Sequence, residues 1–306
     1  MAEHIAVLAN PSSGKGRGGR AAEAAVLHLR SRGAEVRAYA GGSAADTARL
    51  TVAALADDPR ALVVVGGDGT LSGILDTVCA AAAPVVLVPA GTGNDLARAL
   101  GLPRGDAAAA AELALTGVPR PVDVGEVSTA AGTRKFLTIA AFGFDAKVSD
   151  RTNRLRWPHG APRYYLALLI ELVRLRAMDF SLAIDGEPAR RAPGTLIAAG
   201  STSSYGGGMP ICAGAVPDDG LLDIVHVAPL GRLRLLRLFP LLLRGSHLRR
   251  PEVSHRRART VTVSAPGLVV YADGERVGEN VCTVAVLPAA LTMMVPEATM
   301  RSEGVR

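Results

Sequence analysis

Ala61-Leu-Val-Val-Val-Gly-Gly-Asp-Gly-Thr70 is the stretch of this chain that decides its fold. Its first five residues are apolar and three of them are β-branched, which predicts a buried parallel strand. A glycine-rich turn follows directly, and a helical pattern continues from Leu71. Glycines at such a turn let backbone N–H groups approach a phosphate, and the following helix N-terminus adds positive potential. The stretch therefore predicts either a phosphate-binding loop or a tight turn in which Asp68 caps a helix.

A second loop of the same kind favours the phosphate-binding interpretation. Residues 84–89 form another apolar strand, and Ala90-Gly-Thr-Gly-Asn-Asp95 follows it before a helix from Leu96. Ligands of open α/β sheets bind in the crevice outside the carboxyl ends of the strands, where both loops are expected to lie. A carboxylate would repel bare phosphate, so we expect Asp68 to meet it through Mg²⁺. The two loops together predict a nucleotide site.

The composition restricts the class of protein. The chain has 306 residues, of which 49% are hydrophobic and 20% charged, as in globular proteins with a large core. Its net charge of +6 suits an anionic partner such as ATP, nucleic acid or an anionic membrane. Aromatic residues make up only 4% and no nucleic-acid motif is recognised, so we expect no nucleic-acid partner.

The cellular compartment is also predicted from the sequence. No signal-peptide pattern and no uninterrupted apolar span is visible, so a cytoplasmic location is expected. The cysteines are isolated and lack metal-binding spacing, which predicts free thiols in a reducing compartment.

Strand and helix patterns alternate over residues 1–121, which predicts a parallel α/β nucleotide-binding domain. Strands separated by Gly or Asp turns then dominate residues 122–287, which predicts a β-sandwich domain. The expected strands are residues 122–127, 134–142, 180–185, 195–201, 222–228, 259–264 and 268–272, with helices inserted at 163–177 and 229–245.

The segment Gly14-Lys-Gly-Arg-Gly-Gly19 leaves a different enzyme class open. It follows a strand and satisfies G-x-G-x-x-G, the fingerprint of dinucleotide-binding dehydrogenases. A dehydrogenase would leave the two later glycine loops unexplained. No G-x-x-x-x-G-K-[ST] sequence occurs, so the chain is not a P-loop enzyme.

The order of motifs resembles the diacylglycerol kinase catalytic superfamily, which includes bacterial lipid kinases and sphingosine kinases. The resemblance covers nearly the whole chain, although GGDGT is shared with NAD kinases. It implies that the segment 288–306 returns to the first domain. The motifs are Asn10-Pro-Ser-Ser-Gly-Lys-Gly16, GGDGT, GTGNDLA, Gly143-Phe-Asp-Ala146, Val216-Pro-Asp-Asp-Gly-Leu-Leu-Asp223 and Asp273-Gly-Glu275.

Phosphoryl transfer to an alcohol needs a positioned nucleotide, a metal ion and a base. The resemblance implies Glu275 as the base, where an exposed hairpin residue would otherwise be expected, and we assign the metal-linked carboxylate to Asp68. Asp95 is a further candidate acid, with helix capping as its alternative role. The expected nucleotide contacts are Asn10, Gly66, Gly67, Asp68, Gly69, Thr70, Gly91, Thr92 and Asn94.

The resemblance also implies a second, structural Mg²⁺, held by the Asp219 carboxylate and the carbonyl groups of Val216 and Leu221. Mixed oxygen ligands of this kind suit a hard cation. An ordinary Asp-Gly β-turn is the alternative.

Two segments have the composition of a membrane interface. Residues 151–165 combine arginines with Trp and Tyr, and residues 229–250 are rich in Leu with scattered Arg. Packing of these segments on their own domain is the alternative. Sphingosine kinases place an acid near the position of Lys147, and a lysine there favours a neutral lipid alcohol over a cationic amine.

The helix after GGDGT departs from the family pattern. Relatives commonly have Asn-Glu and Asn-Gly there, where this chain has Ser72-Gly73 and Asp76-Thr77. The departure leaves the acceptor side of the site harder to assign.

These observations predict an ATP-dependent lipid kinase that transfers the γ-phosphate to a membrane lipid hydroxyl. Diacylglycerol is the favoured acceptor, and phosphatidic acid would be the product. An NAD kinase-like phosphotransferase and a nucleotide-binding regulator with weak catalysis remain alternatives. We expect peripheral association with the inner face of the membrane, and the oligomeric state is open, with a homodimer among the options.

Overall fold

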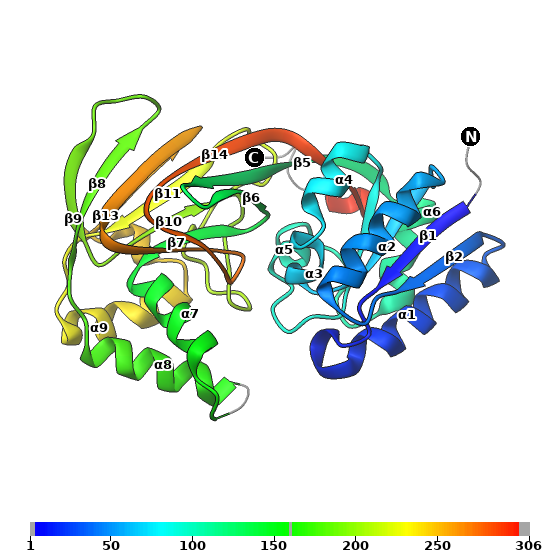
Figure 1. The fold of residues 1–306 in the computed structure, drawn as a ribbon, viewed down its shortest axis with the longest axis horizontal. Coiled ribbons are helices and arrows are strands. Elements are labelled where there is room, and N and C mark those ends of the chain that lie inside the picture. The colour runs from blue at the N-terminus through cyan, green and yellow to red at the C-terminus, as the bar shows by residue number, and fades with distance from the viewer. Residues whose placement is uncertain (1–3, 159–160, 300–306) are drawn as a thin grey trace. The chain divides into compact units, whose positions relative to one another are not determined.

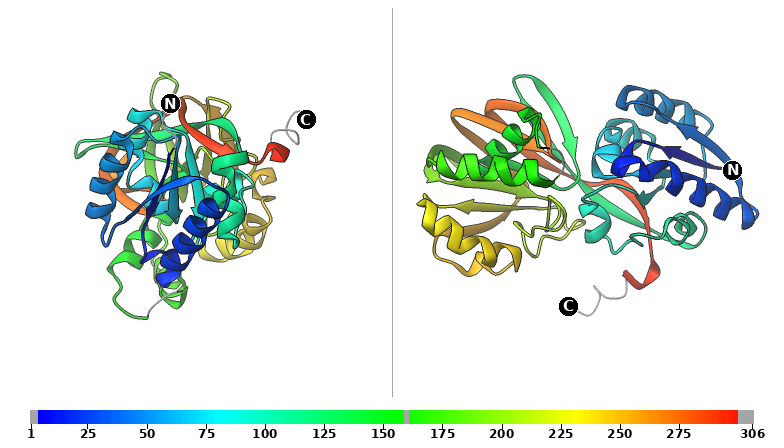
Figure 2. Two further views of the ribbon diagram at one scale, coloured as in Figure 1. Left: turned by 90° about the vertical axis from the view of Figure 1, so that its right-hand side faces the viewer. Right: turned by 90° about the horizontal axis from the view of Figure 1, so that it is seen from below.

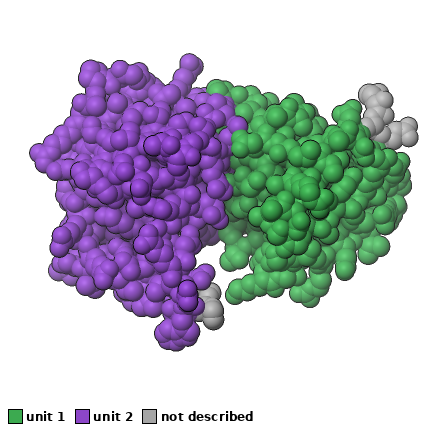
Figure 3. Space-filling model, viewed as in Figure 1, with its two compact units in different colours: residues 1–124, 288–306 green, residues 125–287 purple. Residues whose placement is uncertain are grey.

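The computed structural model describes residues 4–158 and 161–299. The chain divides into two compact units, Met1–Val124 with Pro288–Arg306 and Gly125–Leu287 (Figure 3). Two strands, β5 and β14, contribute residues to both units. The first unit is an α/β fold and the second is mainly β (Figure 1).

The first unit is built on a parallel sheet of order β14-β4-β3-β1-β2. Strands β1 and β3 are buried along their whole length, as continuous apolar runs of this kind require. The chain leaves β1 toward β2 on one side and continues through β3 and β4 on the other. The carboxyl ends of β1 and β3 therefore flank the point where the strand order reverses, which is where such sheets bind ligands.

Helices cover this sheet, with α1 packing on α6 and α2 on α4. Ser43 and Asp106 accept hydrogen bonds from backbone N–H groups at the starts of α2 and α6, so both helices begin where capping residues stand. The elements are β1 (His4–Ala9), α1 (Ser13–Ser31), β2 (Glu35–Ala40), α2 (Ala44–Ala56), β3 (Ala61–Gly66), α3 (Asp68–Ser72), α4 (Leu75–Ala81), β4 (Val85–Pro89), α5 (Asp95–Ala99) and α6 (Ala107–Thr116), with the end of β14 (Glu275–Val295).

The second unit contains an antiparallel sheet of order β12-β11-β10-β7-β13-β14, with β8 and β9 continuing from β13 and β5 and β6 from β14. Helices α7, α8 and α9 lie along one side of this sheet (Figures 1 and 2). The elements are β5 (Val118–Thr129), β6 (Gly132–Phe136), β7 (Ile139–Gly143), α7 (Phe144–Arg154), α8 (Ala161–Val173), β8 (Met178–Ile184), β9 (Arg190–Gly194), β10 (Leu196–Gly200), β11 (Leu222–Val227), α9 (Arg232–Leu243), η1 (His247–Arg249), β12 (Val253–Ala258), β13 (Thr260–Ala272) and β14.

Two apolar cores explain why the central strands of this unit are buried on both faces. Ile197 of β10 belongs to one core, together with Phe142 of β7 and Val261 of β13. Its neighbour Leu196 belongs to a second core, which also receives Leu242 from α9. Alternate residues of β10 thus enter different cores, so all five residues of the strand are buried.

The predicted fold class, an α/β domain followed by a β-sandwich domain, is confirmed, but several strand boundaries differ. The expected strand 134–142 is two strands, because the N–H groups of Leu137 and Thr138 donate to the Asp273 carboxylate at 2.8 Å each. The expected strands 259–264 and 268–272 form one strand, β13, in which an irregularity after Ser264 accommodates Pro266-Gly267.

Strands β9 and β12 were not predicted. Both lie at sheet edges and carry two adjacent arginines, so their sequences look like those of loops. Charged side chains are common on edge strands because they hinder pairing with other chains. Helix α7 was also missed, because polar residues dominate its sequence. Within the described ranges, no helix is both long and apolar enough to cross a membrane.

Candidate functional site

Three loops meet at the carboxyl edge of the parallel sheet in the first unit. The first loop, residues 10–18, follows β1 and includes the start of α1, which is interrupted by non-helical backbone at residues 14–16. The second, residues 66–70, joins β3 to the start of α3, and the third, residues 90–95, joins β4 to α5. Their backbones are bonded to one another: the Asn10 N–H donates to the Val65 carbonyl at 3.2 Å, and the Ala90 N–H donates to the Gly66 carbonyl at 2.8 Å. The predicted nucleotide-binding residues are therefore brought together.

Glycines are required where these loops touch. A Cβ atom on Gly91 would lie 2.5 Å from the Gly67 Cα atom, and one on Gly14 would lie 1.9 Å from the Ala90 carbonyl oxygen. Gly14 also has φ +59°, a conformation that favours glycine. Any larger residue would push the loops apart. The loops therefore contact one another directly through their backbones.

Two side chains of the first loop tie it to the others. The Ser13 hydroxyl lies 3.1 Å from the Thr70 hydroxyl, and an Arg17 guanidinium nitrogen donates to the Gly91 carbonyl at 2.9 Å. Neither residue was predicted from the sequence. Ser13 lies inside the N-terminal motif and Arg17 directly follows it, but a contact across many residues of sequence leaves no local pattern.

Asp68 has a structural role that was not predicted in this form. One carboxylate oxygen accepts the Asp95 N–H at 2.9 Å, and the other accepts the Leu96 N–H at 3.2 Å. Asp68 therefore caps the N-terminus of α5, the helix after the third loop, and a negative charge is favourable there. An ionised carboxylate has about four lone-pair positions, so these two bonds leave capacity for further ligands.

Two polar residues of the third loop, Asn94 and Asp95, contact groups within or next to that loop. The Asn94 side chain accepts from the Gly91 N–H at 3.0 Å and donates to the Gly91 carbonyl at 3.1 Å. Asp95 is buried and lies 3.7 Å from an Arg98 guanidinium nitrogen as an ion pair. Asp95 is the first residue of α5, preceded by Asn94 in a left-handed conformation. The Thr92 side chain, in contrast, is exposed.

Glu275, the expected base, follows a two-residue hairpin turn in the second unit. Asp273 and Gly274 have φ +48° and +80°, and Ala272 pairs with Glu275 across the turn. The Asp273 carboxylate holds the turn through the backbone of Leu137 and Thr138 and the Thr138 hydroxyl, at 2.5 to 2.8 Å. The Glu275 side chain is exposed. The turn is therefore anchored while the carboxylate of Glu275 faces solvent.

The turn expected to hold a structural Mg²⁺ provides suitable donors, but one of them has a competing partner. Asp219 accepts the Leu221 N–H at 3.0 Å through one oxygen, and its other oxygen pairs with the Arg257 guanidinium from β12. A carboxylate beside backbone carbonyls is a hard-oxygen donor set of the kind Mg²⁺ takes. A cation at the second oxygen would have to displace Arg257. The described residues contain no group of three or more His, Cys, Asp or Glu arranged for a metal.

A buried carboxyl group that the prediction did not include lies beside an apolar cavity in the second unit. Asp145, the second residue of α7, is buried. Burial raises its pKa from 3.8 to about 6, and a hydrogen bond from Tyr205 opposes the rise. The cavity of about 110 Å³ is lined mainly by apolar residues of α7, α8 and α9. Leu169 and Leu236 line it while being 58% and 52% exposed, so the cavity reaches the surface between α8 and α9.

The capping role of Asp68 predicts a stability effect. Asp68→Ala removes a charged acceptor from two backbone N–H groups, so it should lower the free energy of unfolding by about 2–4 kcal/mol. Asp68→Asn keeps one acceptor and should cost less. Urea denaturation measures both, with the exposed Glu23→Ala as control. An Asp68→Ala protein as stable as the control would contradict the capping role.

The buried Asp145 predicts a pH dependence. Because its pKa is about 6 in the folded protein and 3.8 when unperturbed, the folded state binds the proton more tightly. The stabilisation is complete below about pH 4 and is lost as the pH rises through 6. Asp145→Asn should remove this loss, worth about 3 kcal/mol at roughly 1.4 kcal/mol per pKa unit. Equal pH slopes in the wild type, Asp145→Asn and the exposed control Asp179→Asn would refute it.

Comparisons with known proteins cover both units. Residues 4–127 match the diacylglycerol kinase catalytic domain, and residues 138–295 match the YegS C-terminal NAD kinase beta sandwich-like domain. A diacylglycerol kinase of Mycobacterium tuberculosis is 44% identical over 95% of each chain. A probable YegS-like lipid kinase of Pseudomonas fluorescens is 34% identical over 92% of this chain and 93% of its own.

Solved structures show the same fold. A putative diacylglycerol kinase from Bacillus anthracis superposes with a TM-score of 0.78 at 21% identity, over 97% of this chain and 98% of that one. An NAD kinase from Archaeoglobus fulgidus in complex with ATP gives a TM-score of 0.55 at 16% identity, over 97% and 96%. With 44% identity to a diacylglycerol kinase along almost its whole length, this chain belongs to the family of diacylglycerol and YegS-like lipid kinases.

Proposed function

We propose that this protein is an ATP-dependent lipid kinase that phosphorylates a lipid hydroxyl, with diacylglycerol as the favoured acceptor and phosphatidic acid as the product. The observation that carries the proposal is the contact of the glycine loops at the carboxyl edge of the parallel sheet, in a chain of this kinase family. An NAD kinase-like activity is the second candidate, because the fold is shared with an NAD kinase.

The loops of the first unit are assigned to ATP. Glycines at positions 66, 67, 69 and 91 let phosphate oxygens approach the backbone closely. The Gly91 N–H itself already donates to the Asn94 side chain. Asn10, Thr70, Thr92 and Asn94 complete the proposed nucleotide site, with Asn94 acting also through the shape of its loop. Asp68 is assigned to the nucleotide-bound Mg²⁺, and Asp95 remains a further candidate acid.

The proposed chemistry is a direct phosphoryl transfer. Glu275 accepts the proton of the lipid hydroxyl, the oxygen attacks the γ-phosphorus, and the bond to the bridging oxygen breaks to release ADP. When bound, Mg²⁺ neutralises charge on the phosphate oxygens. The exposure of Glu275 fits a base that must meet a substrate, and the Asp273 anchor limits where its carboxylate can reach.

The second unit offers features suited to a lipid partner. Tyr165, Leu169 and Val173 are exposed at intervals of four residues along α8, and Leu233, Leu236 and Leu243 are exposed on α9. Arg232 joins the helices by donating to the Leu172 and Val173 carbonyls at 2.6 to 3.2 Å. Exposed apolar stripes beside basic residues suit a membrane with anionic lipids. We therefore propose peripheral association with the inner membrane face, whether the protein acts as a monomer or a homodimer.

The kinase assignment predicts the result of a transfer assay. With Mg²⁺ and γ-labelled ATP in mixed micelles, label should pass to diacylglycerol rather than to ceramide, sphingosine, phosphatidylglycerol or NAD. Glu275→Gln should lower turnover by about 10²–10⁴-fold, because general base catalysis is lost. Glu279→Gln, on the same strand and also exposed, is the matched control.

Three outcomes of this assay would change the proposal. Label on NAD would move the protein to the second candidate function. Unchanged turnover in Glu275→Gln would remove Glu275 from the mechanism. No transfer to any acceptor, with ATP binding intact, would favour a nucleotide-binding regulator.

For the second metal we propose that Val216, Asp219 and Leu221 hold a structural Mg²⁺ in competition with Arg257. Arg257→Ala should lower, by severalfold, the Mg²⁺ concentration at which the melting temperature rises, because Mg²⁺ no longer has to displace Arg257 from Asp219. The effect is no larger because a half-exposed ion pair contributes about 1 kcal/mol or less. Arg256→Ala, whose side chain pairs with Glu187, is the control. If Asp219→Asn responds to Mg²⁺ as the wild type does, the ion is not held at this turn.

A further inference from the structure

A second cavity in the second unit, called here the basic cavity, is lined mainly by charged groups. It has a volume of about 320 Å³ and lies between α7 and the end of α8. Two carboxylates face five cationic side chains, so the lining carries a net charge of about +3. Its charged residues are Lys147, Asp150, Arg151, Arg154, Glu171, Arg174 and Arg176, with Phe144 and Leu175 as apolar walls.

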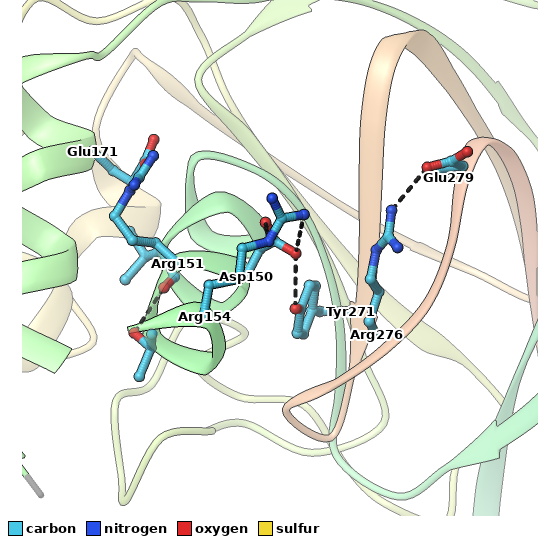
Figure 4. Close-up of polar contacts among 9 residues, drawn as sticks. Asp150, Arg151, Arg154, Glu171, Tyr271, Arg276 and Glu279 are labelled. Atoms are coloured by element: carbon cyan, nitrogen blue, oxygen red, sulfur yellow. Dashed lines mark hydrogen bonds and ion pairs between the residues drawn. The ribbon is translucent and has the colours of Figure 1, made fainter. Parts of the chain in front are cut away.

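Both carboxylates already have partners within the protein. Arg151 pairs with Glu171, and Asp150 pairs with Arg154 at 2.9 Å (Figure 4). Asp150 also accepts a hydrogen bond from the Tyr271 hydroxyl at 3.2 Å. Glu171 is buried, so its negative charge acts mainly on its partner Arg151. These pairs leave the positive charge of the other cations uncompensated.

Three cations of the basic cavity form no side-chain hydrogen bond or ion pair with the described residues: Lys147, Arg174 and Arg176. Lys147 stands four residues before Arg151 and seven before Arg154, so α7 presents all three on one face. Arg174 and Arg176 follow the end of α8 at Val173. Cations from two helices are thus collected around one hollow.

Arg174 and Arg176 stand just after the end of α8, but another residue already binds the last carbonyl groups of that helix. Basic side chains after a helix often bind its last carbonyl groups. Here Arg232 does so, donating to Leu172 and Val173. Arg174 and Arg176 are therefore not needed at the helix end. Cations gathered around one hollow raise the local positive potential, which attracts an anion.

We infer that the basic cavity binds a phosphate group, carried either by a phospholipid headgroup or by a soluble phosphate ester. Guanidinium groups bind phosphate oxygens in pairs, and the Lys147 ammonium adds a compact charge. The volume is ample for one phosphate group. None of the residues that line it is assigned above to the nucleotide, to Mg²⁺ or to the base, so the inference goes beyond the proposed transfer reaction.

The test measures binding without ATP, so its result does not depend on kinase activity. Inorganic phosphate and glycerol 3-phosphate are titrated calorimetrically, and vesicles of phosphatidylcholine, alone or mixed equally with phosphatidylglycerol, are used in sedimentation at fixed ionic strength. The variant is Arg174→Glu with Arg176→Glu. The control is Arg20→Glu with Arg60→Glu, which makes the same charge change at exposed sites of the first unit.

The expected result is a loss of binding of about tenfold or more in the cavity variant and a much smaller loss in the control. Binding of soluble phosphates that follows this pattern identifies a phosphate ester as the ligand. Binding only of phosphatidylglycerol vesicles with the same pattern identifies a lipid headgroup. The milder Arg174→Gln with Arg176→Gln repeats the test if the first variant unfolds. Equal losses in cavity and control variants, or no wild-type binding to any probe, would overturn the inference.

Discussion

The contact of two backbones, at Gly67 and Gly91, is the constraint on which the rest of the first unit depends. No Cβ atom fits at either position, so two strand–helix connections are held at backbone contact distance. Asp68, next to Gly67, also links the two connections, because its carboxylate accepts the N–H groups of Asp95 and Leu96. The result is an edge of the sheet where two strand–helix connections meet through their peptide groups.

In the second unit, too, an aspartate carboxylate fixes a turn by accepting backbone N–H groups of a distant segment. Asp273 accepts two backbone N–H groups from the link between β6 and β7, as Asp68 accepts two from the start of α5. In both cases a carboxylate in a glycine-containing turn binds the backbone of a distant segment. Each hydrogen bond to a charged acceptor contributes about 1.5–3 kcal/mol, enough to hold a loop in one conformation. An aspartate in such a turn can therefore be structural even inside a functional motif.

The sequence predicted the α/β fold and the three loops well, because apolar runs and glycine motifs are local signals. It could not reveal the role of Asp68 in capping α5, or the links made by Ser13 and Arg17, because these contacts join residues far apart in the chain. Strands β9 and β12 were missed because charged edge strands lack an apolar pattern. The environment of Asp145 depends on three helices packing together, which no local pattern encodes.

Strand β14 has a consequence for the order in which the protein is made. It runs from Glu275 to Val295, and Met293 near its end pairs with Val85 in the parallel sheet of the first unit. During synthesis, about two hundred residues are translated after β4 before this partner leaves the ribosome. Until then one edge of β4 lacks its final neighbour, and an open strand edge can pair with other chains. The nascent first unit thus remains incomplete until β14 has been translated.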